Sequence, residues 1–61
     1  MLEYMKTILT KVSFNPRIFE RELKKAIKTL IADEVRELRN WCYVRFGDKH
    51  QKVLQRCFVS V

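Results

Sequence analysis

Hydrophobic and polar residues alternate along residues 6–14, whereas the rest of the chain shows the wider spacing of amphipathic helices. Alternation at a period of two is typical of a β-strand, and β-branched residues, which favour strands, are frequent in this segment. The pattern predicts a strand over residues 6–14 with one shared face: Ile8, Thr10, Val12 and Phe14. A helical pattern competes over an overlapping stretch, with apolar residues at heptad-like spacing: Leu2, Met5, Leu9 and Val12.

Three helices are predicted after the strand, over residues 16–31, 33–46 and 48–58. Asn15 and Pro16 form a strong start, because Asn caps free N–H groups and Pro suits the first helical position. Asp33 and Asp48 are expected to cap the other two helices, and Gly47 is expected to end the middle one. Apolar residues at helical spacing predict the core: Phe19, Leu23, Ala26, Ile27, Leu30, Val35, Leu38, Cys42, Phe46, Val53, Leu54, Cys57 and Phe58. The expected fold class is mainly α, a short N-terminal β-strand followed by three helices packed on one small core.

A single strand leaves its backbone N–H and C=O groups without partners. Its partner is either the same strand of a second copy or the tail Cys57–Val61 of its own chain. The 61 residues form one domain, and a chain of this size buries only about 60% of its unfolded surface. We therefore expect a homodimer held by an antiparallel ribbon, with Ile8, Thr10 and Val12 in its interface.

The order strand–helix–helix over residues 6–46 resembles, in topology, the ribbon-helix-helix repressors, whose dimers lay a β-ribbon in the major groove of DNA. That resemblance implies base contacts by Thr7, Lys11 and Ser13. The chain departs from the family's pattern in two places. Only residues 31–33 separate the two helices, and Leu9 shares the outward face of the ribbon. No membership in the family is inferred.

Thirteen Lys and Arg residues against seven Asp and Glu residues give a net charge of +6. A basic balance suits an anionic partner, and net charge also keeps small proteins soluble, so the overall charge alone favours neither interpretation. The clearest concentration of cations lies on one face of the helix 16–31: Arg17, Arg21, Lys24 and Lys28, broadened by Lys25. Aligned cations could follow the phosphates of a nucleic acid, and a charged outer face is also the norm for helices. Such a stripe would carry no information about base sequence.

A second cluster lies on the helix 33–46, where Arg36, Arg39 and Tyr43 are neighbours at spacings of three and four. Trp41 lies on the other flank of the apolar stripe, and Val44 lies opposite it. Trp, Tyr and Arg dominate interface hot spots, although Trp41 is also placed to cover the edge of the core. The function expected first is a small basic interaction module that self-associates and binds a protein partner. Nucleic-acid binding through the basic helix face is the alternative.

Catalytic, metal-binding and cofactor-binding motifs are not evident in the sequence. Cys42, His50 and Cys57 are spaced too widely for a structural zinc site, which favours ligand pairs two to five residues apart. The two cysteines fall on apolar helix faces and are expected to be small, reduced core residues. No run approaches the roughly 20 apolar residues of a membrane span, and Glu3 interrupts any signal-peptide pattern. A cytoplasmic location is expected.

Overall fold

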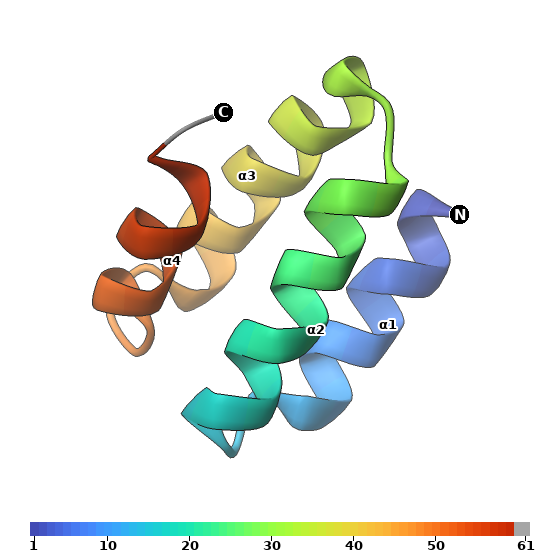
Figure 1. Cartoon of the computed structure of the whole chain (residues 1–61). Coiled ribbons are helices and arrows are strands. Elements are labelled where there is room, and N and C mark those ends of the chain that lie inside the picture. The colour runs from blue at the N-terminus through green and yellow to red at the C-terminus, as the bar shows by residue number, and fades with distance from the viewer. Residues whose placement is uncertain (60–61) are drawn as a thin grey trace.

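The computed structural model describes residues 1–59, which form four helices and no strand (Figure 1). Helix α1 spans Leu2–Val12, α2 spans Pro16–Thr29, α3 spans Ala32–Phe46 and α4 spans Gln51–Phe58. Contacts join α1 to α2, α2 to α4, α4 to α3 and α3 to α1, so the helices close around one core. The principal dimensions are 25 × 22 × 18 Å.

The predicted N-terminal β-strand is wrong, because α1 occupies that part of the chain. The competing helical pattern is the one that forms: Leu2 and Leu9 are buried, and Met5 and Val12 pack against the core. A helix places these four side chains on one side, and its backbone N–H and C=O groups form hydrogen bonds within the segment. A strand would divide them between two faces and leave its backbone unpaired.

The two threonines whose β-branched side chains favour a strand donate hydrogen bonds within α1. The hydroxyl of Thr7 donates to the carbonyl oxygen of Glu3 at 3.1 Å, and that of Thr10 donates to the carbonyl oxygen of Lys6 at 2.9 Å. The strand preference of β-branched residues reflects packing context more than the backbone itself. Burial of one apolar face therefore decides the conformation of residues 2–12.

Without a strand, the ribbon dimer and the ribbon-helix-helix topology have no basis in residues 1–59. Within α1, Ile8 and Val12 are half-buried and Thr10 is exposed, so the three do not form a shared interface face. The alternative partner of the strand, the tail 57–61, begins with Cys57 and Phe58, which are buried in α4. Residues 60 and 61 lie outside the described residues.

Helix α2 begins where the sequence indicates. The side-chain oxygen of Asn15 accepts from the backbone N–H of Arg17 at 3.0 Å and of Ile18 at 3.3 Å, and Pro16 is the first helical residue. These bonds satisfy N–H groups that no helical carbonyl can reach. One face of α2 then supplies the centre of the core through Phe19, Leu23 and Ala26, which are all fully buried.

The starts of the last two helices differ from the expected Asp caps. Helix α3 starts at Ala32 after Ile31, whose N–H donates to the Glu34 carboxylate at 3.3 Å, and Asp33 lies within the first turn. Helix α4 starts at Gln51, so Asp48 lies in the preceding turn. The chain leaves α3 at Gly47, which keeps a right-handed conformation with φ −55°.

Candidate nucleic-acid interface

Four cations of α2 lie together on its solvent-exposed face: Arg17, Arg21, Lys24 and Lys28. Arg17, Arg21 and Lys24 line one shallow hollow with Glu20. Lys24 and Lys28 line a second hollow with Arg56 of α4. Because Lys24 belongs to both, the predicted stripe is continuous and extends across the boundary between α2 and α4.

Arg56 joins α4 to this face through Glu20. Its Nη2 donates to the carboxylate at 2.9 Å and its Nε donates at 3.2 Å, which is the two-pronged geometry that suits a guanidinium. The Lys24 ammonium lies 3.6 Å from the same carboxylate. The hydrogen bond from Arg56 lowers the pKa of Glu20 most, followed by the charges of Arg56 and Lys24. Two cations therefore surround the carboxylate of Glu20.

Lys52 extends the face along α4, because residues four apart on a helix are neighbours and Arg56 follows it at that spacing. Lys52 also lines a hollow with Pro16, at the start of α2, and with Asp48 of the turn before α4. We use the name basic surface for six exposed residues of α2 and α4: Arg17, Arg21, Lys24, Lys28, Lys52 and Arg56.

Lys25, which was predicted to broaden the stripe, lies on its margin. Its ammonium is 3.6 Å from the carboxylate of Glu22, on the side of α2 away from Glu20. Arg21 also approaches Glu22, at 3.9 Å. These exposed pairs are weak, but Lys25 points away from α4 and is not counted in the basic surface.

The length of the basic surface matches a short run of phosphates. From Arg17 to Lys28 the helix rises about 16 Å at 1.5 Å per residue. That is roughly the axial length of five base-pair steps, at about 3.4 Å per phosphate on each strand. A duplex backbone or a single strand lying along α2 would therefore meet several cations at once.

Sequence reasoning missed Lys52 and Arg56 as members of this face. The expected inward residues of α4 already placed both side chains outward. The missing information was which neighbouring helix they would face, and that depends on the packing of α4 against α2.

The residues predicted for a protein interface do not form one surface. Arg36 pairs with Asp33 within the first turns of α3. Trp41 is half-buried on the opposite flank, where its ring makes an edge contact with Phe46 at 5.4 Å. The Lys6 ammonium lies 5.8 Å above the Trp41 ring, so α1 covers that flank. Val44, with 90% of its surface exposed, lies apart from these residues.

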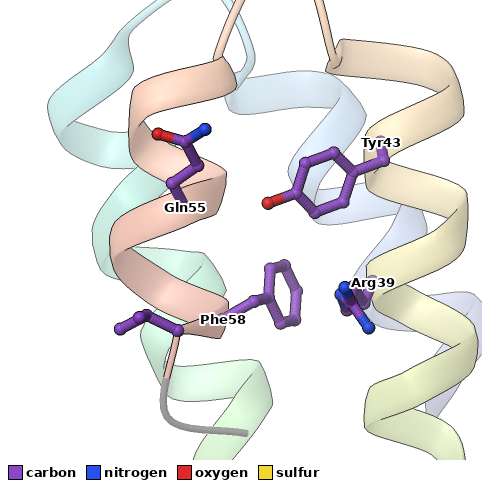
Figure 2. A pocket seen from close by; sticks show the side chains of 5 residues that line it. Arg39, Tyr43, Gln55 and Phe58 are labelled. Atoms are coloured by element: carbon purple, nitrogen blue, oxygen red, sulfur yellow. The ribbon is translucent and has the colours of Figure 1, made fainter.

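Arg39 and Tyr43 instead border a groove between α3 and α4 (Figure 2). The groove is open to solvent, has a volume of about 480 Å³ and is lined by Arg39, Tyr43, Gln55, Phe58 and Val59. The Tyr43 hydroxyl points from α3 toward α4, and the Gln55 side chain projects from α4 on the other side of the groove (Figure 2). We call this cavity the α3–α4 groove.

The cysteines and the histidine belong to the core. Burial raises the pKa of the Cys42 thiol to about 12 and also raises that of Cys57, so both thiols are protonated at neutral pH. His50 is 4% exposed and its Nε2 lies 2.7 Å from the carbonyl oxygen of Ser13. Within residues 1–59, no three His, Cys, Asp or Glu side chains gather in a way that could hold a metal ion.

Comparisons with protein-family models, curated proteins and solved structures found no match to this chain. None of the helices in the described part of the chain combines the length and the apolar character that crossing a membrane requires. The candidate site therefore depends on the geometry and charge of the molecule itself.

Proposed function

We propose that this protein binds nucleic acid through the phosphate backbone, using the basic surface. The observation that carries the proposal is the packing of α4 beside α2, which adds Lys52 and Arg56 to the four aligned cations of α2. Protein–protein interaction, the function expected first from the sequence, loses its main support. The ribbon is absent from residues 1–59, and Trp41 is half-buried against the core.

The charge balance of the basic surface supports an anionic ligand. The six cations outnumber the carboxylates near them: Glu20 already accepts from Arg56, Glu22 lies 3.9 Å from Arg21, and Asp48 borders the same hollow as Lys52. The cations come from two helices that contact each other and pack on one core, so they share one face of the molecule. A contact of this kind neutralises phosphates and releases counterions, and it does not select a base sequence.

The test is fluorescence anisotropy of a labelled random-sequence duplex titrated with the protein at several salt concentrations. If four to six phosphates are neutralised, a plot of log affinity against log salt has a slope between about −3.5 and −5.5. An affinity that barely changes with salt, or no binding at low salt, would refute the proposal.

A matched pair of variants places the contact on the molecule. Reversing two charges of the basic surface, Arg21→Glu with Lys28→Glu, should abolish binding. Reversing two exposed charges elsewhere, Lys11→Glu with Arg36→Glu, changes the net charge equally and should reduce affinity far less. Equal losses in the two double variants would mean that net charge alone drives binding, and the proposed surface would be wrong.

A third variant is expected to bind nucleic acid more tightly. Glu20→Gln removes the carboxylate that Arg56 and Lys24 surround, and so makes both cations available to phosphate. The variant should bind duplex more tightly and show a steeper salt dependence than the parent chain. Weaker binding would contradict the assignment of Arg56 to the contact.

A further inference from the structure

The α3–α4 groove adjoins the basic surface across a single helix. Gln55 lines the groove, and Lys52 precedes it by three residues, a spacing that makes the two side chains neighbours on α4. Arg56 directly follows Gln55 and faces α2. A chain of phosphates on Lys52 and Arg56 would need to cross only the width of α4, about 10 Å, for its next nucleotide to reach the groove.

Half-buried Tyr43 and exposed Arg39 are the accessible flat side chains of the groove, because Phe58 is 5% exposed and belongs to the core. The rings of Tyr43 and Phe58 lie 6.4 Å apart between centroids and are tilted by 45°. The Arg39 guanidinium lies 5.9 Å from the centre of the Tyr43 ring. Aromatic rings and guanidinium planes are the side chains on which proteins stack unpaired bases.

Two polar groups that line the groove suit the edge of a base. Gln55 presents an amide that both donates and accepts, and Tyr43 presents a hydroxyl that does the same (Figure 2). None of the described residues that line the groove carries a negative charge, and Arg39 carries a positive one. The groove is therefore compatible in charge with a nucleotide.

We propose that the α3–α4 groove accepts an unpaired nucleobase from a single strand whose phosphates lie on the basic surface. This inference rests on the proposed function and names its ligand class as single-stranded nucleic acid. A paired base in a duplex is stacked between its neighbours and cannot enter the groove. The protein therefore binds a single strand more tightly than a duplex at the same salt concentration.

The experiment compares a labelled single strand with a hairpin duplex of the same length, using the parent chain and variants at Tyr43. Tyr43→Leu removes the aromatic face and should lower single-strand affinity by about 5- to 100-fold, the range found for loss of one stacked base. Duplex affinity should stay within about twofold, because the variant leaves all six cations in place. Tyr43→Phe retains the ring and should keep most of the single-strand affinity.

Two further measurements keep the test decisive if Tyr43→Leu unfolds. Arg39→Ala changes an exposed side chain and should also lower the affinity for the single strand more than the affinity for the duplex. A strand that contains the fluorescent base 2-aminopurine should change its fluorescence on binding to the parent chain, because the base exchanges stacking on its neighbours for stacking in the groove. Constant fluorescence at saturation would show that no base enters the groove.

The outcomes separate the two proposals. Salt-dependent duplex binding without a single-strand preference would overturn the groove assignment and leave the basic surface intact. Absence of binding to either nucleic acid would overturn both. A third outcome is that a glutamate-rich peptide binds and requires Tyr43, whereas single-strand affinity is unchanged by substitution of Tyr43. That outcome would assign the groove to an acidic protein segment and refute the present inference.

Discussion

His50 joins the turn before α4 to the end of α1, and replacing it gives a direct test of how the helices pack. The ring lies in the turn before α4 and is 4% exposed. Its Nε2 lies 2.7 Å from the carbonyl oxygen of Ser13, which is 37 residues earlier in the chain. Because a carbonyl oxygen can only accept, Nε2 carries the proton. The ring also stacks on Phe19, with centroids 4.4 Å apart and planes 20° apart.

The cost of His50→Ala follows from these contacts. Loss of the hydrogen bond costs about 1 kcal/mol, and loss of ring stacking costs about 1 kcal/mol. The cavity left by a buried ring adds at least about 1 kcal/mol. The total of about 3 kcal/mol compares with roughly 3–9 kcal/mol for the whole unfolding free energy of a chain this size. The variant is expected to be marginally folded.

The assay is thermal and urea unfolding followed by far-UV circular dichroism. A loss of about 3 kcal/mol lowers the Tm of a small domain by roughly 12–24 °C. His50→Phe is the matched control, because it retains a stacked ring and loses only the bond to Ser13, for a cost of about 1 kcal/mol. A His50→Ala variant destabilised by less than about 1 kcal/mol would refute the packing described here.

Three further predictions concern charge, thiols and backbone. The lowered pKa of Glu20 means that its ion pair contributes stability above the carboxyl's ordinary value of 4.5 and loses it as the pH falls through the lower, folded pKa. Glu20→Gln should therefore flatten the acid limb of stability measured by urea unfolding at several pH values. Ellman's reagent at about pH 8 should react with Cys42 and Cys57 only as fast as the chain opens, because both are buried and protonated. Gly47→Ala should lower the Tm, because a Cβ there would overlap the carbonyl oxygen of Tyr43. An unchanged melting curve would contradict the close contact between residue 47 and that oxygen.

The helix α2 shows how far local sequence can predict structure. Asn15, Pro16 and the spacing of apolar residues indicate its start and its buried face, because caps and helical periodicity act within one segment. The alignment of Arg17, Arg21 and Lys28 follows from the same periodicity. These features need no knowledge of the neighbouring helices.

The segment α1 shows where local sequence is insufficient. Its residues carry two patterns, a period of two and a heptad-like spacing, and β-branched residues favour the first. Helix and strand differ here in what they bury and in where the backbone finds its partners. The core formed by the other helices accepts Leu2 and Leu9 from a helix, and the described chain supplies no strand to pair with.

The sequence by itself determined the charge, the core residues of α2, α3 and α4, and the face on which α2 displays its cations. Periodicity and capping are properties of neighbouring residues, so they can be read along the chain. Only the tertiary structure decided that α1 is a helix, that Arg56 meets Glu20 and that Tyr43 borders a groove. Each of these depends on which helices pack together, and burial of a shared core selects that arrangement among many compatible with the same local patterns.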